Sequence, residues 1–501
     1  MTIHRQEIRS QRETGTQVPA QWPGRGPQAA PPPAQPAARP APAPSPVPVP
    51  LPPRTGHRVL VYKQDPSVTE LGARLAFIPT VVLNGPADAR VRIELPGVTP
   101  VARNVSGDFV FDTGTPEFDC AHTFAVVRQA MAMFERHNGG EPIPFAWNAG
   151  GNTDPISVFP HAATGANAFY SRTAQALKFL FFTPEGAPSS SPHSPPFNGA
   201  PLDAPVVHTC RSFDIVAHET GHALLDGLKP GWLSAGNPPQ TGGLHESFGD
   251  LTAIFLALSQ PDQADALVAL TKGNLHDRSF LADLAEEFGK ALGMPAGLRN
   301  ADNDLKLSEV GNEVHAISQV FTGAVYDVLA DVFTFEMTRQ LRTKDPALVL
   351  IEVASALCGL VFEAIVASPA RGARYVDVAN EMLRISADRG EPAIYRTFIR
   401  NRFAVREITT AVTALDDLMS GQMRMTDAGY TGDGRDVTEV GPFDERSASL
   451  RAEQDRSRCC GTLQMPEYEL VAPEKLAERG TLEDDDILRE DLEALRRAFS
   501  K

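Results

Sequence analysis

Apolar residues recur at helical spacing through the second half of the chain, whereas the first half contains shorter, alternating runs. A period near 3.6 residues that persists over many positions indicates helices, and this pattern dominates from residue 211 to about 417. Helices are predicted there at 213–226, 242–255, 279–292, 314–333, 347–367 and 375–386. The apolar spacing of the second of these continues through 251–258. This half of the chain is therefore predicted to be mainly helical.

The segment 57–116 alternates apolar and polar residues, and glycine and proline separate its runs. This pattern is typical of strands joined by turns, so we expect a small β-rich element. Its runs are 58–62, 91–95 and 109–111. A helical pattern follows at 117–138, and strands and loops are predicted for 139–210, with a Ser/Pro-rich surface loop at 188–196.

Both ends of the chain differ in composition from the rest. Residues 1–56 are rich in Pro, Ala, Gln and Arg, which predicts a disordered or polyproline II tail. Residues 418–501 form a polar C-terminal extension. Within it, 483–501 runs from acidic to basic, an order that suits the helix dipole of a terminal helix.

The formal net charge is −16, from 46 Lys and Arg against 62 Asp and Glu. This balance disfavours binding to nucleic acid or to an anionic membrane surface. The longest apolar stretch, 347–367, contains Glu352 and Glu363 on one helix face, as in a core helix with a polar stripe. The N-terminal residues contain no apolar signal region, so we expect the chain to be cytoplasmic at synthesis, with non-Sec export as the alternative.

The five cysteines do not describe a disulfide framework, because their number is odd and their spacing irregular. Cys358 lies in an apolar helical segment and is expected in the core. Cys459 and Cys460 are adjacent in a polar stretch, and their role is left open between an incidental exposed pair, redox activity and metal binding.

The run His218-Glu219-Thr220-Gly221-His222 is an H-E-x-x-H motif within a helical segment. Residues four apart share one helix face, so both imidazoles can reach one metal ion, with Glu219 beside it to take a proton from a bound water. The alternative is a helix that carries two His and a Glu by coincidence. Apolar flanks predict a buried helix, in which these polar residues need partners or a metal, and this favours the metal site.

A catalytic zinc usually has three protein ligands, and the next helical segment offers a third. Glu246 and Asp250 are four apart on one face. Glu246 could complete the ligand set, and Asp250 could accept a hydrogen bond from the outer N–H of a liganding His. The alternative for Glu246 is an exposed acidic residue in a first helical turn, favoured there by the helix dipole.

These motifs resemble those of the thermolysin-like metallopeptidases, the gluzincins, whose zinc set is two His and a Glu. The resemblance covers roughly 117–330. It includes the H-E-x-x-H run, Glu246-Ser247-Phe248-Gly249-Asp250, the segment Asn167-Ala168-Phe169-Tyr170, the pair Leu298-Arg299, and Gly311 to Ser318 around His315. For His315 the alternative is a core histidine, since apolar residues flank it.

The resemblance implies an α+β fold with two lobes, a β-rich N-terminal lobe at 117–230 and a mainly helical C-terminal lobe at 231–417, with the zinc helix at the cleft between them. It also implies a zinc endopeptidase with one catalytic Zn²⁺ and a peptide or protein substrate. His218, His222 and Glu246 would hold the ion, Glu219 would be the general base, and Asp250 would support a ligand. His315 would donate to the tetrahedral intermediate, Asn167 and Ala168 would align the substrate backbone, and Arg299 would line the pocket beyond the scissile bond.

The chain departs from the family pattern at several positions. His245 stands where the family usually has Asn, and residues 223–245 contain no Tyr to help bind the oxyanion, so the indole N–H of Trp232 is the candidate substitute. Asp214 matches a calcium ligand of the family, but the Glu expected after Asp250 is missing, which argues against a family-type calcium pair. Two alternatives therefore stay open: an inactive or latent zinc-binding module acting through protein interactions, and a zinc hydrolase of another substrate class.

Overall fold

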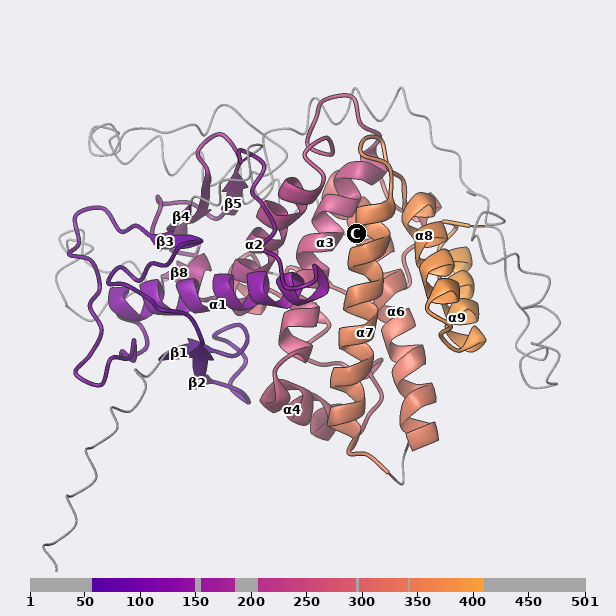
Figure 1. Cartoon of the computed structure of the whole chain (residues 1–501), viewed down its shortest axis with the longest axis horizontal. Helices are drawn as coiled ribbons and strands as arrows, with labels where there is room; N and C mark the ends of the chain where they lie inside the picture. Colours follow the sequence, from indigo (N-terminus) through magenta and orange to yellow (C-terminus); the bar gives the residue numbers. More distant parts are fainter. Residues whose placement is uncertain (1–55, 149–154, 185–205, 294–296, 341–342, 410–501) are drawn as a thin grey trace, which may run out of the picture. The chain divides into compact units, whose positions relative to one another are not determined.

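The computed structural model describes residues 56–148, 155–184, 206–293, 297–340 and 343–409. These residues form a mixed α+β fold, as predicted, with long helices and small sheets (Figure 1). Several sequence predictions lie outside the described residues. They are the tail over 1–56 apart from its last residue, the loop at 188–196, the extension at 418–501 with its helix at 483–501, and the pair Cys459 and Cys460.

The central sheet of the described part has four strands in the order β3-β4-β6-β5. β3 and β4 are parallel, β4 and β6 are parallel, and β5 runs antiparallel to β6, which leaves β5 at one edge. Three two-stranded sheets accompany it: β1-β2, β7-β8 and β9-β10. The strands are β1 (His57–Tyr62), β2 (Ala73–Ile78), β3 (Val91–Ile93), β4 (Ile156–Phe159), β5 (Ala168–Ser171), β6 (Ala176–Phe179), β7 (Phe181–Phe182), β8 (Val207–His208), β9 (Asp283–Leu284) and β10 (Arg299–Asn300).

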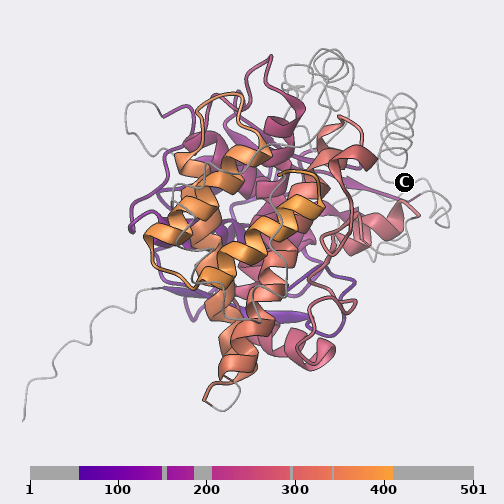
Figure 2. The same ribbon diagram turned by 90° about the vertical axis from the view of Figure 1, so that its right-hand side faces the viewer.

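The helices pack in pairs. α2 lies along α3, α3 along α6, and α6 along α7, while α1 crosses this group and contacts α2, α3 and α7 (Figure 1). α8 and α9 lie over α7 and α6 and are the orange pair facing the viewer in Figure 2. The helices are α1 (Pro116–His137), α2 (Phe213–Leu228), α3 (Pro239–Leu258), α4 (Pro261–Thr271), α5 (Glu286–Ala291), α6 (Val314–Gln340), α7 (Pro346–Ala367), α8 (Tyr375–Asp388) and α9 (Ala393–Val405), with 3₁₀ turns η1 (Thr209–Arg211) and η2 (Leu307–Glu309).

Two predicted elements are wrong in detail. The segment 279–292 is not one helix, because Asp283–Leu284 pairs with β10 and only Glu286–Ala291 is helical. The run 109–111 is not a strand in the structure, where Phe109 makes a single isolated bridge to Val59. The partner of β1 is instead β2, whose burial pattern lacks the strict alternation by which a strand is recognised.

One large hydrophobic cluster runs from Val59 to Ile408 and joins helices and sheets. Two helices, Val314–Gln340 and Pro346–Ala367, are long and apolar enough to cross a membrane by length and composition alone. Their most apolar windows are 83% and 67% buried within the structure, which is the packing of core helices. On α7, Glu352 and Glu363 are exposed and pair with Lys344 and Arg389, respectively.

Glycines let α2 and α3 approach closely where the polar residues of both helices meet. A Cβ atom built on Gly249 of α3 would lie 2.6 Å from Cε1 of His218 on α2. A Cβ atom on Gly221 would lie 2.6 Å from Oγ1 of Thr252 and 3.1 Å from the Cα of Gly249. Real Cβ atoms do not come this close, so these two positions require glycine for the helices to keep their separation.

Candidate metal centre

Three buried side chains converge between α2 and α3. The ligand atoms of His218, His222 and Glu246 all lie within 4.8 Å of one another. Nε2 of His218 is 3.4 Å from Oε2 of Glu246, and Nε2 of His222 is 3.5 Å from Oε1 of the same carboxylate. The two imidazole rings stand at 90° to each other, with centroids 4.5 Å apart. The motif on one helix and the Glu on the next therefore meet at one point.

These distances suit a small tetrahedral ion. Zn²⁺ binds imidazole nitrogen and carboxylate oxygen at about 2.0–2.2 Å, which places tetrahedral ligand atoms about 3.3–3.6 Å apart. Both printed separations between imidazole and carboxylate atoms fall in this range. Burial lowers the pKa of His222 well below its usual value, so its ring is neutral and offers a lone pair. The donor set of two imidazoles and one carboxylate thus fits a zinc ion.

Each of the two histidines is oriented through its other ring nitrogen. Nδ1 of His218 is 2.9 Å from Oδ1 of Asp250, one helical turn after Glu246, and a carboxylate can only accept this bond. Nη2 of Arg299 donates to the same oxygen at 2.9 Å. Such outer partners hold the ring of a metal ligand in one tautomer and orientation.

His222 is oriented by His245, the residue that departs from the family pattern. The Nδ1 atoms of the two rings are 2.7 Å apart, so one donates to the other. Burial lowers the pKa of His245 to about 4, which keeps this ring neutral and able to accept the bond. The substitution therefore retains a hydrogen-bonding partner for His222.

Glu219 is fully enclosed and touches the edge strand. The backbone N–H of Tyr170 in β5 donates to Oε2 of Glu219 at 2.9 Å. The pKa of Glu219 is raised to about 8, because the effects of burial and of Glu246 outweigh those of His218, Tyr170 and Arg299, which lower it. A cation bound beside this carboxyl group would also lower its pKa and favour the ionised form.

His315, at the start of α6, faces the same point from a third helix. Its Nε2 lies 3.1 Å from Oε2 of Glu246, and its Nδ1 lies 2.5 Å from Oε1 of Glu313. Glu313 was not predicted as a site residue, although its place two residues before His315 was the available signal. Burial would raise the pKa of Glu246, but His315 and His222 outweigh it, and the pKa lies well below its usual value.

An apolar pocket adjoins His218 and Glu219. Its walls come from α2, α3, α5, η1 and the strands β5, β9 and β10. The lining residues are Asn167, Ala168, Thr209, Asp214, Ile215, His218, Glu219, Asp250, Ala253, Leu284, Ala285, Phe288, Leu298 and Arg299. All the sequence-predicted site residues except His222, Glu246 and His315 therefore line this pocket.

The backbone at Asn167 and Ala168 is partly committed to internal bonds. The carbonyl of Asn167 accepts from Leu180, and the N–H of Ala168 donates to Oδ1 of Asn167. Because polar groups alternate sides along an antiparallel strand, the carbonyl of Ala168 points away from β6, to the side of β5 where Tyr170 contacts Glu219.

One expectation changes in the structure. Trp232 does not offer its indole N–H to the site, because Nε1 donates to the carbonyl of Pro369 at 2.9 Å. Asp214 is buried, and Oδ2 accepts from the N–H of Ala285 at 3.4 Å. Within the described residues, Asp214 belongs to none of the groups of three or more His, Cys, Asp or Glu residues with converging ligand atoms.

Replacing Gly249 by Ala should displace the ring of His218, since the new methyl group would overlap Cε1. We expect metal affinity to fall by roughly 10–100-fold, the effect typical of disturbing the support of a metal ligand. Isothermal titration of the metal-free protein measures this. Gly311→Ala is the matched control, because a Cβ atom there meets nothing within 4 Å. Equal affinity in the two variants would contradict the helix-crossing geometry.

Comparisons with known proteins give little further information. No family model and no curated protein sequence matches the chain. Among solved structures, the chain is similar to the precursor of protealysin, a metalloproteinase from Serratia proteamaculans, with 12% identity and a TM-score of 0.37. The match covers 61% of this chain and 84% of that one. Similarity at this level carries no conclusion about fold or activity.

Proposed function

We propose that this protein is a zinc-dependent endopeptidase. The observation that carries the proposal is the convergence of His218, His222 and Glu246 with a fourth side chain, the acidic Glu219, which is enclosed beside them and accepts a hydrogen bond from an edge strand. A structural metal site needs only ligands. A buried carboxyl group next to the ligands is what a hydrolase uses to take a proton from water.

The metal-binding residues locate the place where hydrolysis would occur. His218, His222 and Glu246 would hold the ion, and Asp250 and His245 would fix the two imidazoles. Bound there, zinc supplies Lewis acidity that polarises a carbonyl group and lowers the pKa of water. Three protein ligands are the usual number for a catalytic zinc, which keeps one position for water or substrate.

Glu219 would act as the general base. It would accept a proton from the attacking water at its carboxylate and then deliver this proton to the nitrogen of the departing amine. The hydrogen bond from the Tyr170 N–H to Oε2 would hold the carboxylate in place for this role. The enclosure of Glu219 keeps bulk water from competing for the proton.

The edge strand and the pocket suggest a peptide substrate. An extended peptide can add to the free edge of a sheet through backbone hydrogen bonds, and β5 is an edge strand among the described residues. The outward carbonyl of Ala168 would accept from the substrate N–H. Ile215, Phe288 and Leu298 line the neighbouring pocket together with Arg299, so an apolar side chain next to the cleaved bond should be preferred.

One observation favours a second candidate, a non-catalytic zinc module. His315 reaches within 3.1 Å of Oε2 of Glu246, close enough to serve as a fourth protein ligand. Structural zinc sites are closed by four protein ligands, whereas catalytic sites keep an open position. In the endopeptidase, His315 would instead donate from Nε2 to the oxyanion of the tetrahedral intermediate.

His315→Gln separates the two candidates. For the endopeptidase, we expect kcat to fall by roughly 10²–10³-fold, as for loss of one oxyanion donor, with metal affinity nearly unchanged. For a closed structural site, metal affinity itself would fall. His137→Gln is the control, because His137, at the end of α1, belongs to none of the groups of converging ligand atoms among the described residues. Zinc titration and steady-state kinetics on the same preparations give both readings.

The proposed function is tested by cleavage of a diverse set of quenched peptides by the full chain. Cleavage after loading with Zn²⁺, loss of cleavage with a chelator and recovery on adding zinc would support it, and the cut sites should show apolar residues at one flanking position. If zinc is bound by His218, His222 and Glu246 and the protein still cleaves none of the peptides, the result would favour the non-catalytic module.

A further inference from the structure

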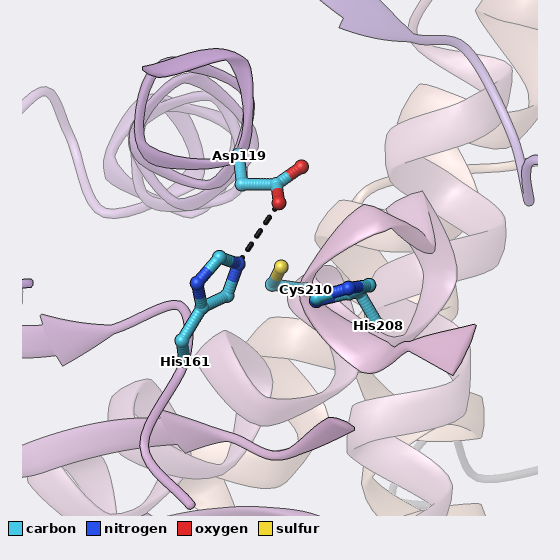
Figure 3. Close-up of side chains that lie close together, drawn as sticks. All are labelled: Asp119, His161, His208 and Cys210. Carbon is cyan, nitrogen blue, oxygen red and sulfur yellow. Dashed lines mark hydrogen bonds and ion pairs between the residues drawn. The ribbon is translucent and has the colours of Figure 1, made fainter. Parts of the chain in front are cut away.

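A second group of potential metal ligands lies outside the site described above. It consists of Asp119 in α1, His161 in the turn after β4, His208 in β8 and Cys210 in η1. The ligand atoms of these four residues all lie within 4.8 Å of one another. Figure 3 shows the sulfur of Cys210 directed into the space between the Asp119 carboxylate and the two imidazole rings. Four segments that are distant in sequence thus present an Asp, two His and a Cys to one small volume.

His208 supplies an independent sign that a ligand is missing from this group. Its side chain is 8% exposed, and neither Nδ1 nor Nε2 has a hydrogen-bond partner. A buried imidazole without a partner is destabilising, because it has lost its hydrogen bonds to water. Its ring lies 4.8 Å from that of His161, centroid to centroid. A metal ion between these rings would satisfy one nitrogen of His208.

The charges around the group fit a divalent ion. Asp119 accepts two hydrogen bonds from Arg211, at 2.7 Å on Oδ1 and 2.9 Å on Oδ2, and Oδ2 also lies 2.9 Å from Nε2 of His161. A carboxylate offers about four lone-pair positions, so Oδ2 can face an ion while Oδ1 stays with Arg211. The ion would take the place now occupied by the proton between His161 and Asp119.

Thiol catalysis is the other chemistry that a Cys, a His and an Asp can perform. It needs a thiolate that a substrate can reach. Cys210 is fully buried, and burial raises the pKa of its thiol well above the usual value. A metal-bound thiol is deprotonated by the ion itself, so burial is compatible with coordination.

We propose that Asp119, His161, His208 and Cys210 form a second metal site that binds Zn²⁺ or a similar thiophilic divalent ion. Two imidazoles, a thiolate and a carboxylate are ligands typical of tetrahedral zinc. In a tetrahedral site the ligand atoms would stand about 3.3–3.7 Å apart, so the widest pairs would close, whereas Oδ2 of Asp119 and Nε2 of His161, now 2.9 Å apart, would separate slightly. Binding would release the thiol proton of Cys210 to solvent and form the metal–sulfur bond, and the proton on Nε2 of His161 would be exchanged through solvent for one on Nδ1.

The position of the site gives it a structural role. Cys210 lies two residues before Ser212, whose side chain caps the N-terminus of α2 by accepting from Ile215. An ion would therefore tie α1, the turn after β4 and β8 to the start of the helix that carries His218 and His222. It would hold this helix in register with the rest of the fold without taking part in the chemistry.

The test uses Co²⁺ as the probe, because a thiolate ligand gives cobalt a charge-transfer absorption that His and carboxylate ligands do not. The protein is the full chain with Cys459→Ser and Cys460→Ser, so that this pair cannot contribute. We expect two Co²⁺ per metal-free chain and the thiolate band. Cys210→Ser should lose the band and one ion, whereas Cys120→Ser, a neighbouring buried cysteine outside the group, should keep both.

His208→Gln is a second variant that tests the site even if Cys210→Ser does not fold. It should weaken Co²⁺ binding at the thiolate site by at least tenfold. Glu246→Gln should weaken binding of the other ion and leave the band, which separates this proposal from the proposed activity. Absence of the band in the starting protein, or its persistence in Cys210→Ser, would overturn the proposal.

Discussion

Glu219→Gln is expected to lower kcat by roughly 10²–10⁴-fold, the contribution typical of a general base, while metal affinity stays unchanged. The amide has nearly the same shape as the carboxyl group but cannot accept the proton of the attacking water. Its oxygen can still accept the hydrogen bond that the Tyr170 N–H now donates to Oε2, so the position of the side chain should be kept. Peptide cleavage and zinc titration on one preparation measure both quantities.

The matched control is Glu336→Gln in α6. Glu336 is also buried, but it pairs with Arg339 and Tyr395 more than five helical turns beyond His315. This variant should retain the activity of the unaltered protein. Activity of Glu219→Gln within threefold of that control would exclude Glu219 as the base. Loss of zinc from Glu219→Gln would instead point to a ligand or structural role for this residue.

Glu246→Gln should weaken zinc binding at the first site by more than the roughly 10–100-fold that loss of an outer hydrogen-bonding partner typically costs. Two causes add. The ion loses a direct carboxylate ligand, and the imidazoles of His218, His222 and His315 lose the negative charge that lies within 3.5 Å of each of them. Cleavage should be lost with the ion and should recover in part at high zinc concentration.

Asp250→Asn is the control variant for Glu246→Gln. Asp250 contacts His218 and Arg299 but is not placed to contact the ion, so its replacement should lower zinc affinity by only about 10–100-fold. Circular dichroism and thermal unfolding show whether each variant folds. Equal loss of affinity in the two variants would contradict the assignment of Glu246 as the third ligand and Asp250 as an outer partner.

Much of the site could be predicted from the chain because its spacing lies within single helices. His218 and His222 are four residues apart, and so are Glu246 and Asp250, so the period of the α-helix alone places each pair on one face. The same period predicted α1, α6 and α7, whose apolar patterns are long. It predicted 279–292 wrongly as one helix, because short strand pairing with β10 overrides local pattern there.

Contacts between distant segments could not be predicted in this way. The pairing of His245 with His222 and the fixing of Glu219 by Tyr170 each depend on how separate elements pack. The group at Asp119 and Cys210 draws on four segments without a common spacing, so no motif marks it in the sequence.

Residue identity supplies the donor atoms, and the regular rise of a helix defines which of them share a helix face, so both can be predicted from the chain alone. The separation of the two ligand-bearing helices follows instead from how they pack. That separation depends on Gly221 and Gly249, where a single added methyl group would force α2 and α3 apart and move His218 away from Glu246. A metal centre tolerates ligand displacements of only a few tenths of an ångström, so this packing fixes whether the residues can act together.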